Sequence, residues 1–352
     1  MDNRWMTAAA AMILAIGAFF VLVWGKSILL PLAVAVMLWY LLNALSDLIS
    51  AYGSKVVKLP RWVYTLLAMV ISLGATSIIF DALTTSLSSV TEAAPLYQTN
   101  FTKLAEKGAA FFGLEATPTI RQIASSLDIK SLVGSLAGMV TTLAGNIGII
   151  IVYLLFILIE ERTFEKKLTA LFKSEEDRGR VIGVIEGIQS RIRTYVFIKT
   201  ALSGLTGVLS YAILLMVGVD YALFWAFLIF LLNYIPTIGS MVGVLLPTLL
   251  TLVQFSSPGP FFVVLASLGT VQFLIGNILD PKLMGGTLNL SALVVLFSLA
   301  LWGKLWGVVG MFLCVPFTVM AMIIFAEFPR TRPIAVLLSG DGDPGPTGEE
   351  AQ

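Results

Sequence analysis

The stretch NYIPTIGSMVGVLLPT at residues 233–248 is the part of the sequence on which the fold prediction chiefly depends. It lies inside 59 consecutive residues, 221–279, that contain no Asp, Glu, Lys or Arg. An uncharged run of that length exceeds the ~20 residues that one membrane helix needs. Its middle nevertheless contains five residues that disrupt a regular helix: Pro236, Gly239, Ser240, Gly243 and Pro247. Broken backbone at membrane depth is tolerated where protein or a water-filled cavity satisfies its polar groups, so this stretch is predicted to form part of a transport pathway.

The overall composition predicts an all-α polytopic membrane protein. Of the 352 residues, 58% are hydrophobic and only 12% are charged, whereas soluble domains carry roughly 25% charged residues. The net charge is +1 without a large basic patch, which argues against a nucleic-acid partner. The chain has no His, the commonest metal ligand and the usual general base. We therefore expect no cofactor, no metal site and no enzymatic activity.

Apolar runs along the chain predict about eight membrane segments. The expected domains are membrane helices 1–3 at 1–80, an extracytoplasmic helical segment at 81–131, membrane helix 4 at 132–159, a charged amphipathic cytoplasmic segment at 160–199, a transport core with broken helices at 200–328 and a disordered cytoplasmic tail at 329–352. The segment at 81–131 could continue the third span. In this topology 16 of the 22 Lys and Arg residues share the side of the N-terminus, so both termini are predicted to be cytoplasmic.

Two segments of the C-terminal half, 221–255 and 289–325, share an unusual length and an interruption near the middle. They contain 35 and 37 residues, long for one helix and short for two full spans with a loop. Two arms of about 15 residues each would reach most of the way across a ~30 Å hydrocarbon core. With one span between them, they are predicted to be two re-entrant helical hairpins of inverted orientation. Paired spans with a bent tip are the alternative.

Amide and hydroxyl side chains around these interruptions are the candidate substrate-binding groups. Such groups are costly in lipid unless they pair or face a cavity, so bonding between helices is the competing explanation for each. The candidate transport-pathway residues are Asn233, Pro236, Thr237, Gly239, Ser240, Asn277, Asp280, Gly307 and Gly310. Neutral amides and hydroxyls suit a small polar, weakly charged solute. The nearby carboxylates, including Asp280, lie at span ends, whereas a proton relay normally needs them within the spans.

Short motifs of the C-terminal half point to a known family. They are IPTIG at 235–239, Pro247, NILDPK at 277–282, LWGVVG at 305–310 and Pro316. Together they resemble the autoinducer-2 exporter (AI-2E, formerly UPF0118) family of bacterial membrane proteins, and the resemblance covers nearly the whole chain. Members usually have an aromatic or similar residue after Ile-Pro and a proline after the glycine, where this chain has the more polar Thr237 and Ser240.

The resemblance implies a multi-pass secondary transporter of the bacterial inner membrane that forms homo-oligomers such as pentamers. Its partners would be the lipid bilayer and a small-molecule solute, with or without a coupling ion. We therefore expect an exporter of a small polar metabolite or a quorum-sensing molecule such as autoinducer-2, working by alternating access around the two broken hairpins. A monovalent cation (sodium or lithium)/proton antiporter and a non-transporting membrane scaffold are the alternatives.

Overall fold

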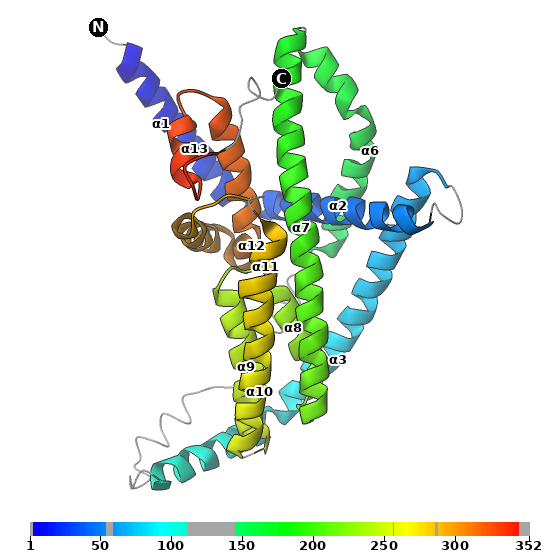
Figure 1. The fold of residues 1–352 in the computed structure, drawn as a ribbon, viewed down its shortest axis with the longest axis vertical. Helices are drawn as coiled ribbons and strands as arrows, with labels where there is room; N and C mark the ends of the chain where they lie inside the picture. The colour runs from blue at the N-terminus through cyan, green and yellow to red at the C-terminus, as the bar shows by residue number, and fades with distance from the viewer. Residues whose placement is uncertain are drawn as a thin grey trace. The chain divides into compact units, whose positions relative to one another are not determined.

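The computed structural model describes residues 3–53, 59–111, 145–172, 174–255, 257–285 and 288–344 (Figure 1). The described residues are almost entirely helical, with one isolated β-bridge between Leu290 and Ser339. The elements are α1 (Asn3–Trp24), α2 (Lys26–Gly53), α3 (Arg61–Phe111), α6 (Ile147–Leu171), α7 (Glu175–Val217), α8 (Ala222–Leu232), α9 (Ile238–Phe255), α10 (Pro258–Phe273), the π-helix η1 (Leu274–Leu279), α11 (Asp280–Met284), α12 (Ala292–Glu327) and α13 (Arg332–Leu338). The predicted all-α fold is confirmed.

Six helices within these ranges are long and apolar enough to cross a membrane. They are Lys26–Ala51, Arg61–Ile78, Glu175–Val217, Ile238–Phe255, Pro258–Met284 and Ala292–Glu327. Shorter apolar helices occur at Met12–Trp24 and Ala222–Leu232. Many of their large apolar side chains are exposed, as expected for helices whose outer faces contact lipid. The chain is therefore a multi-pass membrane protein, and the cytoplasmic position of its termini stays a prediction.

The chain divides into two compact units. Unit 1 comprises Met1–Leu45, Asn146–Val196 and Gly286–Gln352, and unit 2 comprises Ser46–Gly145 and Phe197–Gly285. Helices α2 and α7 are continuous and contribute one part to each unit. The two interrupted segments predicted from the sequence consequently fall in different units, 221–255 in unit 2 and 289–325 in unit 1.

The charged segment at 160–199 is shared by two long helices instead of forming a helix of its own. The end of α6 contributes its first part, and α7 then runs for 43 residues without the predicted boundary at 199/200. No proline interrupts α7, and three carboxylates in its first turn, Glu175, Glu176 and Asp177, interact favourably with the positive end of the helix dipole. Residues 132–144 of the predicted fourth span lie outside the described ranges.

The third span continues into the segment predicted to project from the membrane. Helix α3 contains 51 residues, about 75 Å at 1.5 Å per residue, which is far more than a bilayer core requires. It passes through Pro95 without ending. The rest of the predicted outer segment, 112–131, lies outside the part of the chain that the structure describes.

The prediction of a disordered tail from residue 329 is wrong for its first half. Helix α13 packs against α12, and Met322, Ala326 and Ala335 form a buried cluster between them. Asn289 donates hydrogen bonds to Asp341 Oδ1 (2.6 Å) and to the carbonyl oxygen of Asp343 (2.7 Å). The prediction gave too much weight to the Gly, Pro and Asp content of residues 339–352 and too little to the apolar sequence RPIAVLL at the start of the tail. Residues 345–352 lie outside the described ranges.

In unit 2, α3 is hydrogen-bonded to the connection between α7 and α8 and to the end of α9. The Tyr97 hydroxyl donates to Asp220 Oδ2 (2.8 Å), and the Asn100 amide donates to the carbonyl oxygen of Val253 (3.0 Å). Gln254 connects the same region, since it donates to Gly218 O (2.8 Å) and accepts from Asp220 N (2.9 Å). These bonds fix the start of α8 and the end of α9 against α3.

We expect Tyr97→Phe to lower the free energy of unfolding by about 1–2 kcal/mol, because it removes a buried hydrogen bond to a carboxylate. Burial and the bond to Asp220 raise the pKa of Tyr97 in the folded state. The stabilisation is therefore fully present below the pKa of an unfolded tyrosine, about 10, and is lost as the pH rises toward the raised value. Thermal unfolding at pH 7 and above pH 10 measures this difference. Equal melting of Tyr97→Phe and the exposed control Tyr211→Phe at pH 7 would contradict it.

Candidate functional site

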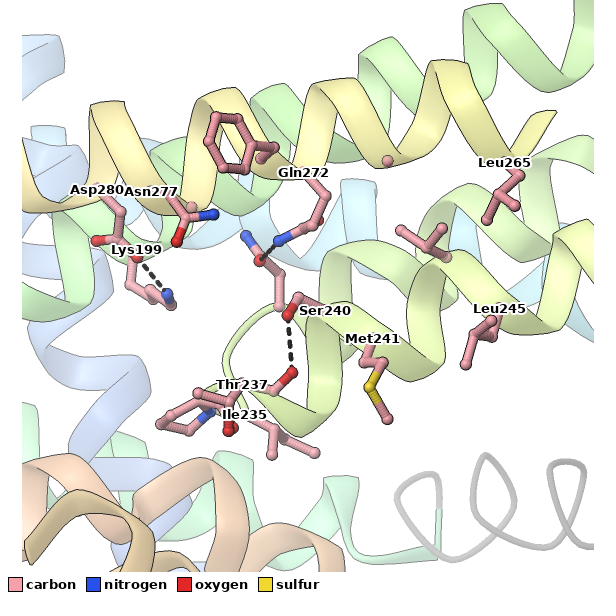
Figure 2. A pocket seen from close by; sticks show the side chains of 16 residues that line it. Lys199, Ile235, Thr237, Ser240, Met241, Leu245, Leu265, Gln272, Asn277 and Asp280 are labelled. Carbon is pink, nitrogen blue, oxygen red and sulfur yellow. Dashed lines mark hydrogen bonds and ion pairs between the residues drawn. The ribbon is translucent and has the colours of Figure 1, made fainter. Parts of the chain in front are cut away.

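Unit 2 contains a pocket of about 540 Å³ bordered by α9, by α10 with η1 and by the beginning of the unit-2 part of α7 (Figure 2). Its wall combines apolar side chains such as Met241, Leu245 and Leu265 with a cluster of polar ones. The polar side chains are Lys199, Asn233, Thr237, Ser240, Gln272, Asn277 and Asp280. An apolar cavity with a few convergent polar groups is the usual form of a small-molecule site.

The first interrupted segment folds as two helices joined by a tight turn. Helix α8 ends at Leu232 and α9 begins at Ile238, as the prolines and glycines of the sequence predicted. Thr237 has a φ of 58°, a left-handed conformation that is strained for a β-branched residue. The Pro236 carbonyl accepts hydrogen bonds from Ile238 N (2.6 Å) and from the Thr237 hydroxyl (2.7 Å). Strained backbone of this kind is concentrated at ligand-binding sites.

Gly239 permits the close approach of α9 to α8. A Cβ atom at this position would lie 1.7 Å from the carbonyl oxygen of Leu232 and 3.0 Å from Cβ of Ile235. No side chain fits in that space. Gly239 therefore packs behind the turn and does not line the pocket, although the sequence placed it among the pathway residues.

Asn233 lines the pocket, but its side-chain amide forms hydrogen bonds that connect neighbouring helices. It is 6% exposed, donates to Ser203 Oγ on α7 (3.2 Å) and accepts from Gln272 Nε2 on α10 (3.1 Å). Tyr234 adds a second bond to α7 by donating to Thr200 Oγ1 (2.6 Å). Bonding between helices, which the sequence left as the competing explanation, is what the structure shows for Asn233.

The opposite wall contains a π-helix, which the sequence did not indicate. Over η1 the hydrogen bonding widens, and Asp280 N donates to Ile275 O, five residues earlier instead of four. Such segments are rare and often occur at functional sites. Asn277 lies within η1 and Asp280 follows it directly, and both line the pocket. The wider turn sets the register in which these two side chains reach the same cavity.

An ion pair closes one part of the pocket wall. Lys199 Nζ on α7 lies 2.7 Å from Asp280 Oδ2 on α11, and the two side chains are 12% and 20% exposed. The sequence identified Asp280 but assigned Lys199 to the charged cytoplasmic segment. The available signal was its position, since Lys199 is the last charged residue before 20 uncharged residues, 200–219.

The remaining candidates, Gly307 and Gly310, lie in unit 1 and do not line this pocket. Gly307 interrupts α12 with φ 66° and ψ −145°, where the sequence predicted a break. The two arms then fold back on each other, because the Ser298 hydroxyl contacts Cys314 O (3.1 Å) and the Thr318 hydroxyl, up to 20 residues away. A Cβ atom on Gly310 would lie 2.0 Å from Trp302 O. Both interrupted segments thus use one glycine to bring two arms together.

Comparison with known proteins extends these observations. The sequence profile of AI-2E family transporters matches residues 10–330. The chain belongs to the AI-2E transporter family. One relative, the AI-2 transport protein TqsA of Escherichia coli K12, is 29% identical over 319 residues, 90% of each chain.

Two further relatives carry the name "Putative transport protein". The one from Haemophilus influenzae is 30% identical over 293 residues, 80% of this chain and 82% of the relative. The one from Borreliella burgdorferi is 37% identical over 195 residues, 54% of each chain, so the match spans about half the length of that relative. The family description and the names of these three relatives are those of transporters and not of enzymes.

Proposed function

We propose that this AI-2E family member is a secondary transporter of the bacterial inner membrane that exports a small polar solute, such as autoinducer-2, through the unit-2 pocket. The observation that carries the proposal is the meeting of two irregular backbone segments at one cavity, the turn at 233–237 and the π-helix η1. Irregular backbone at membrane depth is characteristic of transporter binding sites. The name of the relative TqsA supports autoinducer-2 as the first solute to test.

The polar groups of the pocket favour a solute with hydroxyl groups. The Thr237 and Ser240 hydroxyls donate within the turn, to Pro236 O and Thr237 O, and each hydroxyl oxygen retains lone pairs that can accept from a ligand. Asn277 is exposed, and its amide forms no hydrogen bond with another described residue. Its amide can therefore both donate to and accept from a bound hydroxyl.

Alternating access around the two interrupted segments is the transport mechanism that we propose, with both acting as re-entrant hairpins. The support is their shared construction, a positive φ at the tip (Thr237 or Gly307) followed by a glycine that contacts the first arm (Gly239 or Gly310). Assembly into homo-oligomers and the use of a coupling ion belong to the same proposal. Nothing in the described residues favours the alternative of a cation/proton antiporter.

We expect Asn277→Ala to reduce solute export about tenfold, because one hydrogen bond to the transported molecule is worth about 1.4 kcal/mol. Cells with and without the protein would be compared by metabolite profiling inside and outside, with autoinducer-2 measured directly. Ile278→Ala is the matched control, since Ile278 is an exposed residue of the same π-helix that does not line the pocket. Equal export by both variants would refute the site, and identical profiles with and without the protein would refute the function.

A further inference from the structure

The pocket holds two ionisable side chains among its lining residues, and they neutralise each other. Lys199 Nζ and Asp280 Oδ2 are 2.7 Å apart, and little of either side chain is exposed. Figure 2 shows the pair at one end of the cavity with Asn277 beside it, and Leu245 and Leu265 at the other end. The pocket therefore carries both signs of charge but no net charge.

A solute with a net charge would disturb this balance. A monoanion that binds Lys199 leaves one negative charge in the pocket without a counter-charge, whether it displaces the Asp280 carboxylate or binds beside it. A monocation that binds Asp280 leaves one positive charge uncompensated in the same way. An unpaired charge in a mostly buried site is strongly unfavourable, because neither water nor a counter-charge compensates it.

A solute without net charge avoids this penalty. An uncharged polyhydroxylated molecule leaves the pair intact and has hydrogen-bonding partners in Thr237, Ser240 and Asn277, which line the same pocket. A zwitterion can exchange the single pair for two new ones, one with each side chain. We propose that the Lys199–Asp280 pair is the specificity determinant that restricts this pocket to small polar solutes without net charge. The inference rests on the proposed transport function.

Three solutes that share a hydroxylated five-carbon chain test the proposal. Xylitol is neutral, xylonate is a monoanion and 1-amino-1-deoxyxylitol is a monocation at pH 7. Their counterflow would be measured in proteoliposomes of the full chain, held at zero membrane potential. For the wild-type protein we expect xylitol flux at least tenfold above the flux of either charged analogue.

Variants of the pair should shift this selectivity in opposite directions. Asp280→Asn leaves Lys199 unpaired and is expected to raise the xylonate/xylitol flux ratio at least tenfold. Lys199→Gln leaves Asp280 unpaired and should instead raise the 1-amino-1-deoxyxylitol/xylitol flux ratio. The double charge reversal Lys199→Asp with Asp280→Lys should restore exclusion of both ions. Asp47→Asn is the control, because the Arg61–Asp47 pair (3.8 Å) lies outside the pocket, and its flux ratios should equal those of the wild type.

The flux ratios separate a failure of this inference from a failure of the proposed function. Wild-type protein that carries xylitol and xylonate equally, or pair variants with unchanged ratios, would overturn the charge selectivity and leave the transport function standing. Wild-type protein that carries none of the three solutes would overturn the transport of hydroxylated solutes and the inference with it. Ratios within one preparation are independent of how much of a variant folds, and if one single variant does not fold, the other decides.

Discussion

Gly239→Ala is expected to abolish transport and to lower the free energy of unfolding by about 2–3 kcal/mol. The added methyl carbon would lie 1.7 Å from Leu232 O and 2.7 Å from the carbonyl carbon of the same residue. These are backbone atoms, so no side-chain rotation relieves the overlap. Overpacking that forces a backbone shift costs typically about 1–3 kcal/mol, and here the shift separates α9 from α8 and distorts the turn that borders the pocket.

Gly204→Ala is the matched control for this substitution. Gly204 lies within α7, and a Cβ atom there would meet no atom within 4 Å. Because alanine is favoured over glycine in a helix interior by up to ~1 kcal/mol, this variant should melt at the wild-type temperature or above it and retain transport. Thermal unfolding and solute flux would be measured for both variants. Wild-type flux and melting for Gly239→Ala would show that the turn does not depend on this close approach.

Glycine and proline positions predicted the interruptions of the fold but not all of the packing around them. The breaks near residues 233–237 and at Gly307 lie where the sequence placed them. In the sequence Gly243 resembles Gly310, because each is followed by a proline, Pro247 or Pro316, yet a Cβ on Gly243 would lie 3.5 Å from Ile229, which is an ordinary contact. Gly239 is the structural counterpart of Gly310, because both face a carbonyl oxygen of the first arm. Spacing alone does not reveal which glycine faces the neighbouring backbone.

The polar part of the site was only partly predictable, since it depends on contacts between distant residues. Six of the nine candidate residues line the pocket. They were predictable because the polar side chains lie next to the helix breaks in the sequence, and the same breaks border the pocket in the structure. Lys199 and Asp280 are 81 positions apart, and no local pattern signals that they pair. The π-helix could not be predicted either, because the mostly apolar sequence of Leu274–Leu279 is compatible with an ordinary α-helix. Whether these residues bind the solute stays a prediction.

Lys199→Met is expected to lower the free energy of unfolding by about 3 kcal/mol. The substitution keeps most of the apolar stem but leaves the Asp280 carboxylate without its partner at a site that is only 20% exposed. Removing one member of a buried pair typically costs about 3–5 kcal/mol, and the partial exposure of both groups places the expected value at the low end. Denaturant unfolding of the purified protein in detergent measures the loss.

The double variant Lys199→Met with Asp280→Leu distinguishes the cost of an unpaired charge from the loss of packing. If the destabilisation of the single variant comes from the unpaired, mostly buried Asp280 carboxylate, removing that second charge should recover most of it, because apolar replacements of a buried pair are often neutral or stabilising. Asp280→Leu alone completes the double-mutant cycle and should also be destabilising, because it leaves Lys199 unpaired, so the double variant should be more stable than either single variant. A double variant less stable than Lys199→Met would mean that the two side chains stabilise unit 2 separately, and the mutual neutralisation on which the charge selectivity depends would lose its energetic basis.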